Sequence, residues 1–213
     1  MSSLLGHAAA GFTAYLCCTG ARRPPSRWAA APLVGLAIAP DLDYFAVWLV
    51  DYAANPRVSH SLLFAVAMVL IVHRTMPDAG TVRFRLVGLL AAGGYHAVLD
   101  FLVGAHPVPV FWPFDAGVTC PVGVLPSAGA LAPGNVYLWR NLLIELGLLA
   151  PVFTLLVALC RRHPVRLLLA WMLVVAPMWT MFVLWSLALP RQDANVDGPG
   201  SRRAPASREA DAA

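Results

Sequence analysis

Residues 86–103 read LVGLLAAGGYHAVLDFLV, an apolar run in which His96 and Asp100 are the only side chains that can carry a charge near neutral pH. A transmembrane helix needs roughly 20 predominantly apolar residues, so this run is close to the length of a membrane span. Ionisable groups inside apolar segments are energetically costly and usually mark a functional site. The stretch therefore predicts a membrane helix that also carries part of a buried site.

The chain on both sides of this run repeats the apolar pattern. Further apolar segments lie over residues 3–18, 28–50, 59–73, 136–160 and 165–189. Of the 213 residues, 59% are hydrophobic and 12% are charged, whereas soluble domains carry about 25% charged residues. We therefore predict an all-α fold, a polytopic membrane helical bundle with about five to six apolar segments.

Two features set the expected domain organisation. Pro40 interrupts the second segment and predicts a broken helix there, because proline removes a backbone donor and clashes with the preceding turn. Residues 191–213 are rich in Ala, Asp, Arg, Pro and Gly, which predicts a disordered C-terminal tail. The membrane-embedded domain is expected to span residues 1–190.

The charge pattern indicates an orientation and excludes some partners. The net charge is +4, and arginines gather in residues 22–27, 74–85 and 161–166. Positively charged loops favour the cytoplasmic side, which predicts a multi-pass protein of the cytoplasmic membrane. No basic stripe interleaved with aromatic residues is present, so no nucleic-acid partner is expected. The cysteines form no CxxC pair, which disfavours a cysteine zinc site.

Six ionisable side chains within the apolar segments lie towards the membrane face opposite the arginine loops. They are His7, Asp41, Asp43, His60, His96 and Asp100. His96 and Asp100 have i, i+4 spacing and share one helix face. Asp41 and Asp43 follow Pro40, and a broken helix in a membrane is tolerated where it lines a cavity or is buried in protein. We therefore predict that the six side chains meet at one site on the non-cytoplasmic face.

The chemistry of this set is that of a divalent metal site. Imidazole and carboxylate ligands suit zinc best, with manganese or magnesium as alternatives, and six ligands could hold one or two ions. A bound metal could lower the pKa of its water to about 7 for attack on an ester, and a carboxylate could take the proton. All six residues are predicted metal ligands, and Asp43 and Asp100 are the predicted catalytic residues.

Simpler interpretations exist for the individual residues. A single histidine in a membrane helix is more often a hydrogen-bond partner of another helix than a ligand. Asp41 and Asp43 could cap a half-helix and interact with its dipole. Glu145 could be an intramembrane polar contact or part of the cavity wall, and His106 could contact substrate.

The order of these motifs resembles the YdjM-like family, described as inner-membrane metal-dependent hydrolases, one member being LexA-binding. The motifs are Gly6-His7, Pro40-Asp41-Leu42-Asp43, Ser59-His60-Ser61, His96-Ala97-Val98-Leu99-Asp100 and Pro109-Val110-Phe111-Trp112-Pro113-Phe114. The resemblance covers roughly residues 4–115 and implies a metal role for the six residues.

The resemblance has one departure and one extension. The family commonly has His-Arg-Gly-x-Thr-His-Ser at the third motif, whereas residues 55–61 read NPRVSHS and lack the first histidine. The helix-borne ligands are also remotely similar to those of zinc-dependent phospholipase C, which would imply phosphoester hydrolysis.

We therefore predict an integral membrane metal-dependent hydrolase. Its substrate would be an ester or phosphoester of a lipid-like or membrane-proximal molecule. The protein would be embedded in the lipid bilayer. Two alternatives stay open. A transporter would bind its substrate near the midplane with access from both faces. A metal-binding scaffold without hydrolytic activity would have no open coordination position.

Overall fold

The computed structural model describes residues 3–19, 27–50, 56–75, 86–104, 107–114, 117–127 and 134–189. Its helices are α1 (Leu4–Cys18), α2 (Ala31–Ile38), α3 (Asp43–Val50), α4 (Leu62–Thr75), α5 (Leu86–Val103), α6 (Val136–Cys160) and α7 (Val165–Ala188). Short 3-10 helices are η1 (Arg27–Ala30), η2 (Ala39–Leu42) and η3 (Val58–His60). These described ranges contain no strand, only an isolated bridge between Val108 and Val118, so the predicted all-α fold is confirmed.

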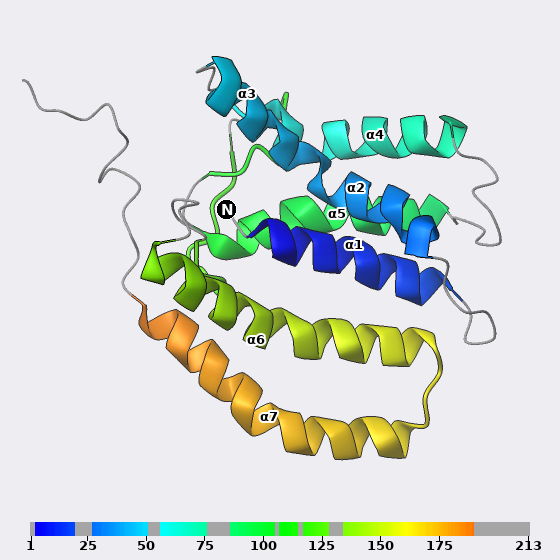
Figure 1. Cartoon of the computed structure of the whole chain (residues 1–213), viewed down its shortest axis with the longest axis vertical. Coiled ribbons are helices and arrows are strands. Elements are labelled where there is room, and N and C mark those ends of the chain that lie inside the picture. The colour runs from blue at the N-terminus through cyan, green and yellow to red at the C-terminus, as the bar shows by residue number, and fades with distance from the viewer. Residues whose placement is uncertain are drawn as a thin grey trace, which may run out of the picture.

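The helices have the apolar character that the sequence predicts. Three of them, α5, α6 and α7, are long and apolar enough to cross a membrane, and α1 and α4 are shorter apolar helices. Figure 1 shows α7 on the outside of the bundle, beside α6. Apolar side chains on α7, such as Leu173 and Val174, are largely exposed, as expected for a surface that faces lipid.

Helix α1 lies at the centre of the bundle, with α2 and α5 on one side and α6 on the other (Figure 1). Small residues allow this close packing. A Cβ atom on Gly11 would lie 2.6 Å from the backbone oxygen of Leu33 and 2.8 Å from the Cα atom of Val34. Glycine at this position therefore lets α1 and α2 approach backbone to backbone, as small residues do in membrane bundles.

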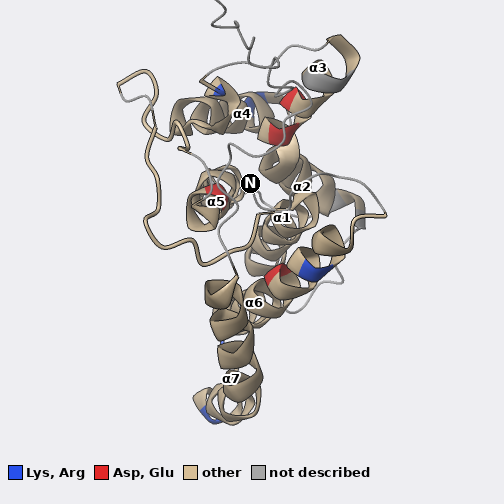
Figure 2. Ribbon diagram, turned by 90° about the vertical axis from the view of Figure 1, so that its left-hand side faces the viewer, with Lys and Arg blue, Asp and Glu red and all other residues tan. Residues whose placement is uncertain are grey.

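The predicted break at Pro40 is present. Helix α2 ends at Ile38, η2 covers Ala39–Leu42 and α3 begins at Asp43. The 3-10 turn places Asp41 in the interior, where it is buried. The acidic residues of the described helices lie on η2, α3, α5 and α6 (Figure 2).

Several predicted features fall partly or wholly outside the described residues. The tail over 191–213 and the arginines over 22–26 lie outside them.

The described part of the connection after α5 packs against the start of α4, where the Leu62 backbone N–H donates a hydrogen bond to the Val110 oxygen. The connection after α5 therefore packs next to η3, which directly precedes the start of α4.

Candidate metal centre

Five of the six predicted site residues meet in the interior of the bundle. His7 comes from α1, Asp41 from η2, His60 from η3, and His96 and Asp100 from α5. None of the five is more than 8% exposed. Helix packing therefore brings together side chains that lie on four separate segments.

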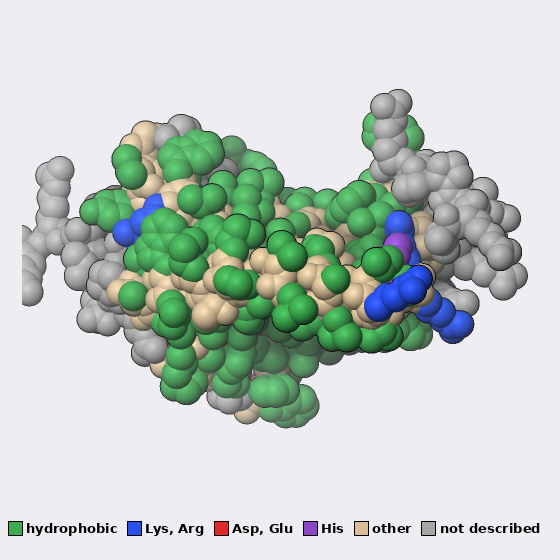
Figure 3. All heavy atoms as spheres, turned by 90° about the horizontal axis from the view of Figure 1, so that it is seen from below, with side chains coloured by type: hydrophobic (Ala, Val, Ile, Leu, Met, Phe, Trp, Pro, Cys, Tyr) green, Lys and Arg blue, Asp and Glu red, His purple; other side chains and the backbone are tan. Residues whose placement is uncertain are grey.

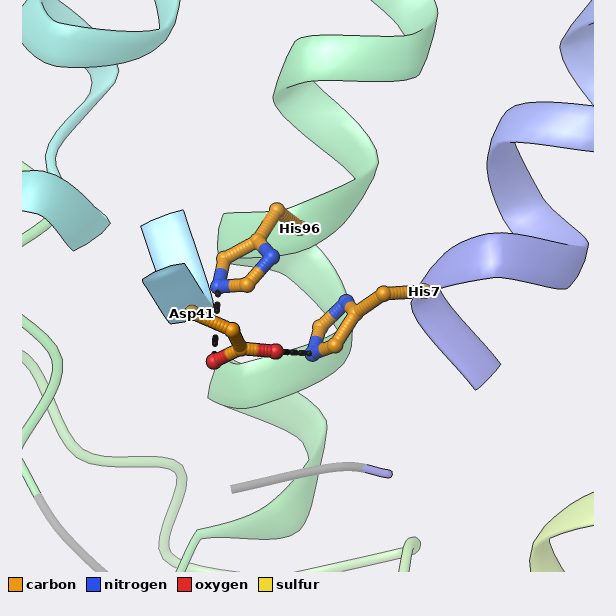
Figure 4. A group of neighbouring side chains, drawn as sticks. All are labelled: His7, Asp41 and His96. Carbon is orange, nitrogen blue, oxygen red and sulfur yellow. Dashed lines mark ion pairs between the residues drawn. The ribbon is translucent and has the colours of Figure 1, made fainter. Parts of the chain in front are cut away.

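The distances show one compact cluster around Asp100 and Asp41. The Asp100 carboxylate oxygens lie 3.4 Å from the Nε2 atoms of His7, His60 and His96. Those of Asp41 lie 3.7 Å from His7 Nε2, 3.6 Å from His60 Nε2 and 3.8 Å from His96 Nε2. Figure 4 shows the Asp41 carboxylate reaching His7 with one oxygen and His96 with the other.

These separations suit a shared cation better than direct hydrogen bonds. An N–H···O hydrogen bond has a length of about 2.7–3.2 Å. Two ligands of a tetrahedral zinc ion with bonds of about 2.1 Å lie ~3.4 Å apart. Two groups, His7 with Asp41 and His96, and His60 with His96 and Asp100, each have ligand atoms close enough to hold one ion.

Buried ligand atoms without a hydrogen-bond partner support the same interpretation. Within the described residues, Asp41 Oδ1, His60 Nε2 and His96 Nε2 are buried and have no hydrogen-bond partner. Buried polar atoms are nearly always paired, and an unpaired group in a native site calls for an explanation such as an ion. The donor atoms present fit a divalent metal.

The α2 backbone orients His96. Its Nδ1 atom lies 2.8 Å from the carbonyl oxygen of Ala37, close to the end of α2. Because a carbonyl oxygen only accepts, Nδ1 carries the proton in this bond. The neutral ring then directs the lone pair of Nε2 at the cluster, which is the usual arrangement for a metal-binding histidine.

A hydroxyl relay orients His60 in the same way. Ser59 Oγ donates to Asp43 Oδ2 at 2.8 Å and lies 3.1 Å from His60 Nδ1. Since the hydroxyl gives its single proton to Asp43, it accepts from His60 Nδ1. The lone pair of His60 Nε2 is therefore also directed at the cluster.

Asp43, the sixth predicted residue, lies outside the cluster of five. Its oxygens accept hydrogen bonds from Arg57 and Ser59, and its closest approach to a ligand ring is 3.9 Å, to His60 Nδ1. The Arg57 guanidinium stacks 4.3 Å from the centre of the Tyr44 ring. Burial is the largest influence and lowers the pKa of Arg57, but the hydrogen bond to Asp43 and the interactions with Asp43 and Tyr44 together outweigh it, so the pKa is raised and Arg57 stays charged. The predicted roles of Asp43 as ligand and catalytic residue stay predictions.

Glu145 occupies a separate buried position, with 1% of its surface exposed. Its oxygens accept the backbone N–H of Ser3 at 3.0 and 3.1 Å, and Ser3 Oγ caps α1 by accepting from the Gly6 N–H at 3.0 Å. The contact therefore connects α6 to the first turn of α1, one turn before His7. His106 lies outside the described residues.

The sequence did not predict the supporting contacts of Ala37, Ser59 and Ser3. Ala37 acts through its backbone carbonyl and Ser3 through its backbone N–H. Backbone groups are the same in every such residue, so nothing in the sequence could identify these two contacts. The Ser59–His60 dipeptide was visible, but its connection to Asp43 depends on the packing of η3 against η2.

Comparison with known proteins gives one family. The family model described as YdjM inner membrane protein matches residues 1–188, which include every helix of the structure. No curated protein and no solved structure matches the chain. The match agrees with the resemblance seen in the motifs and extends beyond residue 115 to the end of α7.

Proposed function

Since the chain belongs to the YdjM inner membrane protein family, we propose that it is an integral membrane metal-dependent hydrolase. Its substrate would be an ester or phosphoester of a lipid-like or membrane-proximal molecule. The observation that carries the proposal is the buried cluster of three histidines and two aspartates with N···O separations of 3.4–3.8 Å.

The residues that would hold the ion are His7, Asp41, His60, His96 and Asp100. Three imidazoles and two carboxylates suit zinc, with manganese or magnesium as alternatives. His96 belongs to both groups of ligands, and a single Nε2 lone pair binds one ion. The shared histidine therefore favours one ion over two.

A bound divalent ion would supply Lewis acidity and activate water near neutral pH. The chain's own residues orient the ligands and handle protons. Asp100 faces the centre with both oxygens. Asp43 is a half-buried carboxylate joined to His60 through Ser59, so this relay could carry a proton from His60 Nδ1 towards the surface.

The surroundings of the cluster support an amphiphilic substrate. Leu42, between the two aspartates of the break, is 51% exposed, and Phe45 on α3 and Leu63 on α4 are also exposed. Leu42 lies on η2 beside Asp41, and Phe45 and Leu63 lie on the helices that follow η2 and η3. A molecule with an acyl chain could contact them while its polar group approaches the centre.

The first test is metal content, measured by plasma mass spectrometry on purified full-length protein. His96→Ala should lose the metal, because it removes a ligand of both groups. The control is His163→Ala, an exposed histidine in the turn after α6, which should retain it. Equal metal content in wild type and His96→Ala would refute the metal centre.

The second test is hydrolysis of a panel of lipid esters and phosphoesters by the metal-loaded protein. Turnover in wild type that is lost in His96→Ala supports the hydrolase. Metal binding without turnover of any substrate would reject it and favour a metal-binding scaffold. Burial of all five side chains is the observation that supports this second candidate, because structural metal sites are closed.

A further inference from the structure

A recess in the surface lies towards the C-terminal end of α1, away from the metal centre. It is a groove of about 310 Å³ between α1 and α6. Its lining along the helices is mostly apolar and includes Leu16, Phe153 and Val157, and Arg161 and His163 line one end. The groove is therefore apolar along the helices and basic at one end.

The basic end has no acidic counterpart on the neighbouring helices. Arg161, Arg162, His163 and Arg166 lie within six residues, at the turn between α6 and α7. Helix α1, α7 and the part of α6 beyond Glu145 contain no aspartate or glutamate. Figure 3 shows basic side chains gathered at this end of the α6–α7 face, among apolar ones. No carboxylate on these helices neutralises the positive charge, so the basic end of the groove can attract an anion.

The turn after α6 holds Arg162 in an unusual backbone conformation. Arg162 has a φ of 56°, in the left-handed region that favours glycine. The turn closes α6 through hydrogen bonds from Arg162 N to Leu159 O and from His163 N to Ala158 O. Glycine is the usual residue at this position of a helix end. Glycine would therefore fit at residue 162 without backbone strain.

We propose that the groove binds one anionic phospholipid. The phosphate would contact Arg161 and His163 at the basic end, with Arg162 and Arg166 adding positive charge. An acyl chain would lie along Leu16, Phe153 and Val157. Basic pockets between membrane helices recognise anionic lipid headgroups in this way. The lipid site is separate from the metal centre and does not depend on the proposed hydrolysis.

The test is equilibrium binding of phosphatidylglycerol and phosphatidylcholine with identical acyl chains to the purified full-length protein, read by native mass spectrometry. Wild type should prefer phosphatidylglycerol. Arg161→Gln should bind it about fivefold more weakly, because one arginine near a phosphate contributes about that factor. The matched control is Arg140→Gln near the other end of α6, which should keep wild-type affinity. Glycerol 3-phosphate, which has the phosphate but no acyl chain, should not displace the lipid.

Arg162→Gly gives a variant that should fold at least as well as wild type, because glycine relieves the left-handed backbone. It should keep or raise the unfolding temperature while weakening phosphatidylglycerol binding about fivefold. Equal affinity for the two lipids, unchanged affinity in both variants, or displacement by glycerol 3-phosphate would each overturn the proposal.

Discussion

Ser59→Ala should weaken metal binding although Ser59 itself touches no metal. The hydroxyl makes two contacts, one of 2.8 Å to Asp43 Oδ2 and one of 3.1 Å to His60 Nδ1. Its loss leaves the His60 N–H without its acceptor, and the ring is free to turn or change tautomer. Outer contacts of this kind are worth about 10–100-fold in metal affinity, which corresponds to about 1.4–2.8 kcal/mol.

The measurement is a competition titration of the purified protein against a chromophoric zinc chelator. Ser59→Thr keeps a hydroxyl and should retain most of the affinity. Ser186→Ala is the matched control, because it also removes a serine hydroxyl that donates a hydrogen bond. That bond runs to the Val124 oxygen over 2.6 Å, and Ser186 lies on α7, which carries none of the cluster residues. It should leave the zinc affinity unchanged.

The proposed orientation of His60 by Ser59 is wrong if Ser59→Ala and wild type bind zinc equally. It also fails if Ser186→Ala lowers the affinity as much as Ser59→Ala does, because the effect would then be a general loss of stability. A loss confined to Ser59→Ala would confirm that the relay from Asp43 orients the ligand.

Three further changes test the packing and the centre. Gly11→Ala should lower the free energy of unfolding by about 1–3 kcal/mol, because the added Cβ would meet the α2 backbone; Gly35→Ala, with open space at its Cβ, is the thermal-unfolding control. Glu145→Ala should lower the free energy of unfolding by about 1–3 kcal/mol, because it leaves the buried Ser3 N–H unpaired. An unchanged unfolding temperature would contradict this. Chelation should lower the free energy of unfolding of wild type by about 2.7 kcal/mol relative to protein with free metal at 100 times its Kd. The unfolding temperature of wild type should therefore fall on chelation, and that of His96→Ala should not.

Much of the fold could be predicted from the sequence, because it depends on local properties. Apolar runs over 86–103, 136–160 and 165–189 are long enough to predict membrane helices, and the structure has helices there. The break at Pro40 follows from the missing backbone donor of proline. Likewise, i, i+4 spacing is sufficient to place His96 and Asp100 on one face of α5.

The assembly of the site depends on tertiary packing. Sequence patterns indicated that His7, Asp41 and His60 lie at one level of the bundle, but not that their rings and carboxylates face each other. That result depends on the close approach of α1 and α2 at Gly11. The sequence could not separate Asp43 from Asp41, since both follow Pro40 with only Leu42 between them.

The sequence by itself determined the helices, their apolar surfaces and the identity of the polar residues among them, because these follow from composition and short-range spacing. Only the tertiary structure decided which atoms those residues present to one another. It directed Asp41 into the centre and Asp43 towards Arg57, and it supplied the Ala37 carbonyl for His96. Tertiary contacts of this kind join residues as far apart in the chain as Ser3 and Glu145, which are separated by 142 positions, and no periodicity along a chain encodes the packing that brings them together.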